Sequence, residues 1–538
     1  MQIQSLPFSS FLTLLAVCAV NHCLGSGVTL ITHGYAGSAD GWVGAMANDI
    51  PNYYSFPGTN FTAITITLTT DGNNNYFYQW EPTNATPPAA TDSGEIIVKL
   101  DWSQMAGGLS APYDISTYNV AGAASWVMLQ TNSIQALGGH ALVEFPIHLI
   151  GHSRGGSLIS EISRILGTNG IWVDHVTTLD PHPLNNDGNF DFGFPTDAPA
   201  KNTYANVLFA DNYWEDLDPL NPLDPTGEPV AGAYVRQLYN LSEGYFNVSS
   251  TSPDHSNVHL WYHGSINLNT PTSYNLAGDA ATIDASMRTN WWVPYEVSGL
   301  RSGFYYSLIG AGNRLSTDQP LGPGYPAISD GCNKWWDFGA GLANNRTPLQ
   351  SNSGAWPNLI KLDVTGTNVI TQGSPLSARF YCEYGGSASN LTCHLYSGND
   401  FNTLGTNGVL LGQYPLSNTG VGSVLIVNAN LSTSNTPPGI HTLYGKIADG
   451  SHTRYLVAPE LVQITPNQQP PTLQIATVNS NQALLSINGL AGEVLVLQTS
   501  SDLQNWVSLA TNTLTSPAWT TNVPLAAGSQ FYRAVLGP

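Results

Sequence analysis

A serine between two glycines, in residues 151–155 (Gly-His-Ser-Arg-Gly), constrains this chain most strongly. Residues 145–150 before it are apolar and predict a buried strand, and the apolar spacing over 157–167 predicts a helix. The glycines permit a tight turn where a Cβ would clash. Such a turn presents the serine hydroxyl and directs the Arg154 N–H at any negative charge that develops there. The segment predicts a nucleophilic Ser153; an inert serine in the same turn is the alternative.

Strand and helix patterns alternate from residue 28 to about residue 300. A parallel sheet with helices on both faces is the arrangement that this alternation favours. The fold class is therefore α/β, with a mostly parallel sheet in residues 27–300. Besides the strand before Ser153, we expect strands at 28–32, 61–68, 96–100, 173–179 and 206–210, and a helix over 120–137.

The C-terminal part of the chain has a different pattern. Residues 301–357 are rich in Gly, Asn, Ser and aromatic residues and read as an extension or linker. Short β runs with turn residues between them fill 358–466, which predicts a small all-β sandwich of immunoglobulin-like type. A Pro-rich linker follows, and 472–538 predict a second small β domain.

The N-terminus and the composition favour an exported protein. An apolar run at 11–20 has signal-peptide length and is too short to span a bilayer, so we expect a signal peptide at 1–26; a buried first strand or helix is the alternative. The net charge of −21 disfavours nucleic acid and anionic membranes as partners. In an oxidising compartment, Cys382 and Cys393 are expected to form a disulfide.

A nucleophilic serine needs an imidazole base and an acid that orients the base. Asp180 and Asp211 each follow a predicted strand, and the residues alone do not separate them. For the base, His255 follows loop residues and precedes an apolar helical stretch, and His259 is the alternate. These two histidines and His263 would share one helix face, but no carboxylate lies in register, so we expect neither a metal nor a cofactor.

A second N–H donor for a developing oxyanion should follow an early strand. Residues 30–35 end in His33-Gly34-Tyr35, where Gly34 allows close backbone approach. The Tyr35 N–H is therefore the expected partner of the Arg154 N–H. An ordinary turn at the end of a strand is the alternative.

Four segments, in this order, resemble the lipase branch of the α/β-hydrolases, especially the pancreatic-lipase type. The resemblance covers roughly residues 27–263 and implies that Asp180, not Asp211, is the acid. His255-Ser256 is also similar to the His-Ser at the base position of fungal lipases. The four segments are His33-Gly34-Tyr35, Leu100-Asp101-Trp102, Gly151-His152-Ser153-Arg154-Gly155 and Thr178-Leu179-Asp180-Pro181.

From the resemblance we expect a secreted serine hydrolase of carboxylic esters. Ser153 would attack the carbonyl, His255 would carry the proton, and Asp180 would orient the imidazole. The substrate would be a small-molecule or lipid ester, and the C-terminal β domains could contact an extracellular surface or polymer. The alternatives are a non-catalytic surface-binding protein on the same scaffold, or cleavage of peptides or thioesters.

Overall fold

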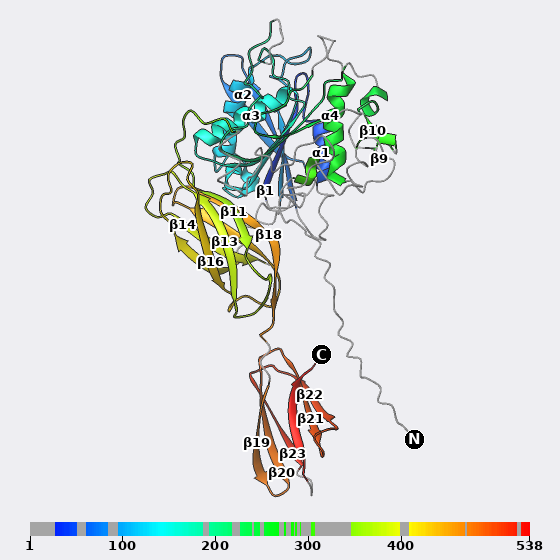
Figure 1. Ribbon diagram of the computed structural model, residues 1–538, viewed down its shortest axis with the longest axis vertical. Coiled ribbons are helices and arrows are strands. Elements are labelled where there is room, and N and C mark those ends of the chain that lie inside the picture. Colours follow the sequence, from blue (N-terminus) through cyan, green and yellow to red (C-terminus); the bar gives the residue numbers. More distant parts are fainter. Residues whose placement is uncertain are drawn as a thin grey trace. The chain divides into compact units, whose positions relative to one another are not determined.

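The structure is a computed structural model, and Figure 1 shows its elements. The expected signal peptide lies outside the described residues, as does most of the extension at 301–357. The chain divides into two compact units, residues 1–370 with 374–464 and residues 371–373 with 465–538, and we describe each by itself. The described residues are 27–50, 61–83, 95–186, 193–217, 226–238, 241–247, 252–267, 274–275, 281–284, 286–287, 291, 303–306, 346–398, 408–467, 471–524 and 529–537.

An eight-stranded sheet forms the centre of the first unit, in the order β3-β2-β4-β1-β5-β6-β7-β8. All neighbours pair in parallel except β2 and β3, which form an antiparallel hairpin. The expected strands are present, and the expected mostly parallel sheet is confirmed. The strands are β1 (Gly27–Thr32), β2 (Phe61–Thr70), β3 (Tyr76–Pro82), β4 (Glu95–Asp101), β5 (Ile147–His152), β6 (Val173–Leu179), β7 (Val207–Trp214) and β8 (Tyr234–Gln237).

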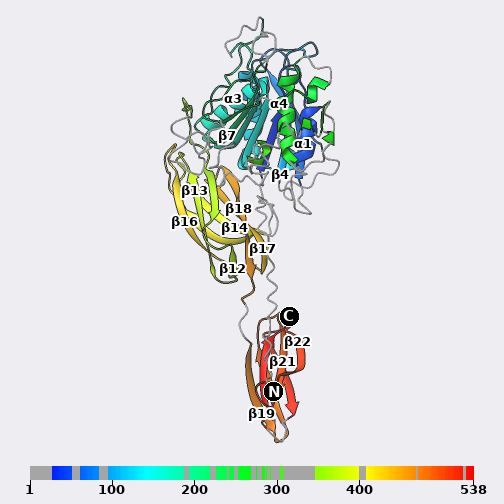
Figure 2. The same ribbon diagram turned by 45° about the vertical axis from the view of Figure 1, so that its right-hand side comes forward.

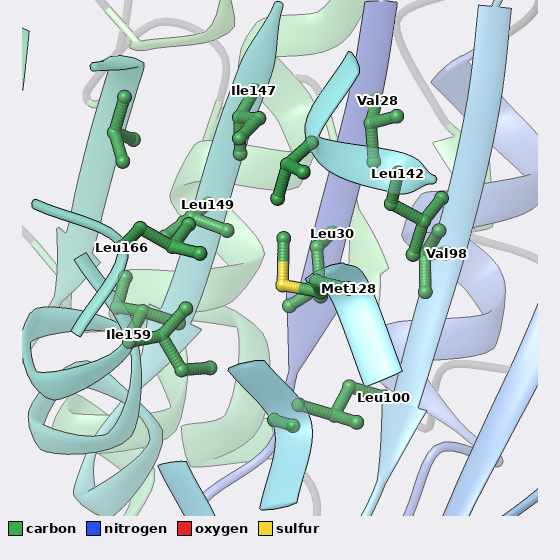
Figure 3. Packing of buried hydrophobic residues seen from close by; sticks show 14 of the residues in the cluster. Val28, Leu30, Val98, Leu100, Met128, Leu142, Ile147, Leu149, Ile159 and Leu166 are labelled. Carbon is green, nitrogen blue, oxygen red and sulfur yellow. The ribbon is translucent and has the colours of Figure 1, made fainter. Parts of the chain in front are cut away.

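Helices cover both faces of this sheet (Figures 1 and 2). Helices α2 (Thr117–Leu129) and α3 (Arg154–Thr168) lie on one face, and α1 (Trp42–Asp49) and α4 (Pro253–Gly264) lie on the other. Since side chains alternate along a strand, each buried strand contributes apolar side chains to the layers on both faces of the sheet. Leu30 of β1 packs in the α2/α3 layer shown in Figure 3, whereas Ile31 packs in the α1/α4 layer.

The helix expected over 120–137 is shorter than predicted. Helix α2 ends at Leu129, Gln130 is extended, and a separate 3₁₀ turn follows at Gln135–Leu137. The Ser133 hydroxyl donates to the Val127 carbonyl over 2.8 Å, which satisfies a carbonyl that a continuing helix would use. Short polar side chains in 131–133 therefore end the helix by competing for its backbone hydrogen bonds.

Two packed sheets follow in the same unit and enclose a core of their own. Their long strands pair antiparallel, so this part is a small β-sandwich of immunoglobulin-like architecture. One sheet holds β11 (Asn358–Val364), β13 (Pro375–Glu383) and β16 (Leu425–Ser432); the other holds β12 (Val369–Thr371), β18 (Thr453–Thr465), β17 (Gly439–Ala448), β14 (Thr392–Gly398) and β15 (Val409–Pro415).

The expected disulfide is absent from this sandwich, because Cys382 and Cys393 are both free thiols. They lie in the core on opposite sheets, on β13 and β14. Burial raises the pKa of Cys382 to about 12 and raises that of Cys393 as well. Both cysteines therefore act as small apolar core side chains.

The second unit is a smaller pair of antiparallel three-stranded sheets. Its core includes Leu485, Ile487, Leu495 and Leu497. Across the described part of the chain, no helix combines the length and the apolar character that crossing a membrane would require. The strands are β19 (Thr472–Asn479), β20 (Gln482–Asn488) and β23 (Ala518–Pro524), and β22 (Val507–Thr513), β21 (Val494–Ser500) and β24 (Phe531–Leu536).

Candidate active site

Ser153 lies between β5 and α3, in a backbone conformation with φ 57° and ψ −128°. Non-glycine residues rarely adopt a positive φ, so the surroundings must hold it. The Ser153 N–H donates to Leu179 O over 2.9 Å, and the Ser153 carbonyl accepts from the N–H groups of Gly156 and His182. Its hydroxyl does not cap α3, which leaves it available for other chemistry.

The glycines around Ser153 stand where backbones approach each other. A Cβ on Gly155 would lie 2.5 Å from the His33 carbonyl oxygen, and one on Gly34 would lie 2.6 Å from Ser153 Cβ. The turn after β1 therefore lies directly against the candidate nucleophile. This is the close approach for which the sequence required glycine at these positions.

Asp180 and His255 form a short hydrogen bond at this edge of the sheet. Asp180 follows β6, and its Oδ2 accepts a hydrogen bond from His255 Nδ1 over 2.5 Å. Its Oδ1 accepts from the Glu215 N–H over 2.8 Å, and its own N–H donates to Tyr213 O over 2.7 Å. Both side chains of the pair are buried, so the carboxylate and the ring are held in one orientation.

His255 lies within α4, whereas the sequence placed it on a loop before the helix. Helix α4 begins at Pro253, since proline suits the first turn of a helix, where its missing N–H has no partner to lose. His255 is thus in the first turn. His152, the residue directly before Ser153, also holds His255, because His152 Nε2 donates to the His255 carbonyl over 2.9 Å.

Burial controls the protonation of this pair. Burial, together with a smaller effect of the neighbouring His182, lowers the pKa of His255 to about 3, and Asp254 opposes the shift. Burial also raises the pKa of Asp180, against the N–H donors of Glu215 and Gly227. The imidazole of His255 is therefore neutral near pH 7, which is the form that accepts a proton.

The two alternates have different partners. Asp211 Oδ1 accepts from His175 Nε2 over 2.8 Å in the core, and the Thr177 hydroxyl donates to the same oxygen. His259 stacks on Trp42 with ring centroids 4.4 Å apart. The structure therefore brings Asp180 and His255 together and pairs neither with an alternate.

The two expected oxyanion donors belong to two backbone turns that meet at Ser153. Arg154 is the next residue, and Tyr35 follows Gly34, the residue in contact with Ser153. Within the described residues, neither backbone N–H donates to another group, and no hydrogen bond joins the Ser153 hydroxyl to His255. Catalytic hydrogen bonds are often long before substrate binds, so the Ser153–His255 bond stays a prediction.

Neither Glu215 nor His152 was assigned a role from the sequence. Glu215 supplies the N–H that binds Asp180, and His152 holds His255 from behind. Both contacts join segments that are distant in sequence, by 35 and 103 positions. The position of His152 inside the nucleophile motif was the one available signal.

Asp180, Glu215 and His255 are also the described residues whose ligand atoms could share a metal ion. Asp180 and His255 touch at 2.5 Å, however, and two ligands each about 2.0–2.2 Å from one ion would stand farther apart than that. The donor set fits a hydrogen-bonded acid–imidazole pair better than a metal centre.

No protein-family model matches the chain, and no curated protein matches it either. Solved structures similar to parts of it include two fibronectin type-III domains of chicken tenascin (9% identity, 34% of this chain and 99% of that one, TM-score 0.18). Others are a cytokine receptor complex (13%, 33% and 91%, 0.15) and the C-terminal domain of wzt (11%, 21% and 75%, 0.16). At these TM-scores the similarities carry no argument about fold or function.

Proposed function

We propose that this chain is a serine hydrolase of carboxylic esters with an α/β-hydrolase fold. Ser153 is the nucleophile, His255 the general base and Asp180 the acid that orients it. The observation that carries the proposal is the 2.5 Å hydrogen bond from His255 Nδ1 to Asp180 Oδ2 beside the turn that holds Ser153. That hydrogen bond fixes the tautomer whose Nε2 is free to accept a proton.

The reaction would proceed in two balanced halves. Ser153 Oγ attacks the ester carbonyl while His255 Nε2 takes the hydroxyl proton, and the Tyr35 and Arg154 N–H groups stabilise the oxyanion. The intermediate collapses to an acyl-serine as His255 returns the proton to the leaving alcohol. Water then attacks the acyl-serine while His255 takes its proton. His255 returns the proton to Ser153 Oγ as the carboxylic acid leaves, which restores the enzyme.

The chain order of the three residues, the sheet and the resemblance to the lipase branch support this proposal. The chain order Ser153, Asp180, His255 is the order expected for this fold, and the parallel sheet is the expected scaffold. The preference for esters over amides rests only on the resemblance to the lipase branch. Secretion by a signal peptide and contact of the C-terminal β domains with a surface or polymer complete the proposal.

A fluorophosphonate probe tests the nucleophile directly, since it modifies only an activated serine. We expect stoichiometric labelling of the wild type, loss of labelling and turnover in Ser153→Ala, and normal labelling in Ser163→Ala, a buried serine of α3, the helix that follows Ser153. An unlabelled wild type would favour the non-catalytic binding protein. A panel of p-nitrophenyl esters of increasing chain length, one thioester and one peptide anilide would then identify the bond cleaved.

A further inference from the structure

The Arg154 side chain is fully buried behind the nucleophile, although a cation in the core needs compensation. The proposed reaction uses only the backbone N–H of this residue. Its guanidinium nevertheless makes five hydrogen bonds, to Asp197, Asp114, Ala106 O and Ile115 O.

Two carboxylates fix the plane of this guanidinium. Nε and Nη2 bind the two oxygens of Asp197 over 2.7 and 2.9 Å, and Nη1 binds Asp114 over 2.8 Å. Asp197 is itself held by the N–H groups of Thr117 and Leu184. Burial disfavours the charge, but the bonds to Asp197 and Asp114 outweigh it and raise the pKa of Arg154. A bidentate pair of this kind gives fixed geometry as well as energy.

The same guanidinium reaches the turn that carries the other oxyanion donor. Arg154 Nη1 donates to Ala106 O over 3.0 Å, and that oxygen also accepts the Ala36 N–H over 3.4 Å. Ala36 directly follows Tyr35 and has a positive φ of 53°. A Cβ on Gly108 would lie 2.6 Å from Ala36 Cβ, so the 106–108 backbone lies against this turn.

A second connection passes through Trp102. The guanidinium lies 5.3 Å from the centroid of the Trp102 ring, within the range of a cation–π contact. The Trp102 indole N–H donates to His33 O over 3.1 Å, and its backbone N–H donates to His33 Nε2 over 3.2 Å. The turn from His33 to Ala36 is thus held at both ends by groups in contact with Arg154.

We infer that Arg154 is a positioning residue for the oxyanion hole, whose side chain fixes the Tyr35 N–H relative to Arg154's own backbone N–H. The inference rests on the proposed function. A looser turn would weaken the donors where charge develops in the transition state and would leave ground-state binding of the ester largely intact.

The test is Arg154→Lys, which keeps the charge and loses the fork of donors. Active sites are counted by fluorophosphonate labelling, and kcat is expressed per labelled site. We expect kcat to fall about 10- to 100-fold with KM nearly unchanged, since small misplacements of catalytic groups cost that much. The inhibition constant of an alkyl trifluoromethyl ketone should rise by the same factor, because its hemiketal oxyanion uses the same two donors.

A matched control and a milder variant complete the experiment. Arg164→Lys, on the solvent side of α3 with Glu161 as its partner, should leave kcat and the inhibition constant unchanged. Should Arg154→Lys fail to fold, Asp114→Asn removes one carboxylate from the guanidinium at a partly exposed position. Its kcat should then fall, and its inhibition constant rise, by one common factor that is smaller than in Arg154→Lys.

A purely structural role would lower the melting temperature or the number of labelled sites only. Folded variants with wild-type kcat per site and wild-type inhibition constants would therefore overturn the inference. An unlabelled wild type would instead overturn the proposed function, and this inference with it.

Discussion

Asp180 follows β6 and Asp211 lies within the neighbouring strand β7, yet each is bonded to a different histidine. Asp180 holds the candidate base, and Asp211 holds His175 in the core. Asp180→Asn should lower kcat about 10³- to 10⁴-fold, because an amide no longer fixes the productive tautomer. The readout is kcat per labelled site on a p-nitrophenyl ester.

Asp211→Asn is the matched comparison for that experiment. It should lower the melting temperature, because the buried hydrogen bonds of Asp211 with His175 and Thr177 become weaker. The loss in the free energy of unfolding should be about 1–3 kcal/mol. The kcat of the folded fraction should stay near that of the wild type. If turnover is lost only in Asp211→Asn, Asp180 is not the acid.

The protonation of His255 predicts how activity depends on pH. The base must be neutral, and its pKa is lowered by burial from 6.5 to about 3, so the neutral form persists into acid. The acid limb of kcat/KM should therefore have its midpoint well below pH 6.5, as far as the fold survives. Initial rates between pH 3 and 8, with circular dichroism at each pH, give the profile. A midpoint at or above 6.5 would contradict the prediction.

The turn after β1 should tolerate no side chain at Gly34. Gly34→Ala would put a Cβ 2.6 Å from Ser153 Cβ and 3.0 Å from its Oγ. The turn must then move away, and kcat should fall by about 10²-fold or more. Turnover per milligram and fluorophosphonate labelling rate measure the loss.

Gly122→Ala offers a control for that substitution in the exposed interior of α2. A Cβ there would meet nothing within 4 Å. Alanine should raise stability by about 0.8–1 kcal/mol through helix propensity and leave kcat unchanged. Wild-type turnover in Gly34→Ala, measured beside this control, would mean that the turn does not approach the nucleophile as described.

Buried strands were predictable from the sequence by the pattern of their apolar residues. In β1, β4 and β5 these residues form short runs, whereas in β2 they alternate with threonine. The edge strand β3 was missed because it alternates half-buried aromatic with exposed side chains, and β8 because it has only four residues. Contacts such as Arg154 with Asp197 depend on tertiary packing, which no local pattern encodes.

Within the first unit, buried polar groups join the β-sandwich to the eight-stranded sheet. Arg454, from β18, donates to the carbonyls of Trp172 and Phe145, and its Nη2 lies 3.5 Å from Asp174 Oδ2. The Trp172 indole N–H in turn donates to Glu383 of β13 over 2.8 Å. The boundary expected at residue 358 is therefore a packed junction, and contacts do not separate the two parts.

This junction predicts that the sheet and the sandwich lose structure together. Arg454→Met removes the cation from two buried carboxylates, Asp174 and Glu383, and should destabilise the unit by about 3–5 kcal/mol. Arg379→Met, an exposed change on β13, is the control and should shift the midpoint little. In Arg454→Met, the urea concentration at which ester turnover is lost and the one at which trypsin begins to cleave within residues 358–465 should both fall by the same amount. Turnover that outlasts cleavage of the sandwich would mean that the sheet does not depend on it.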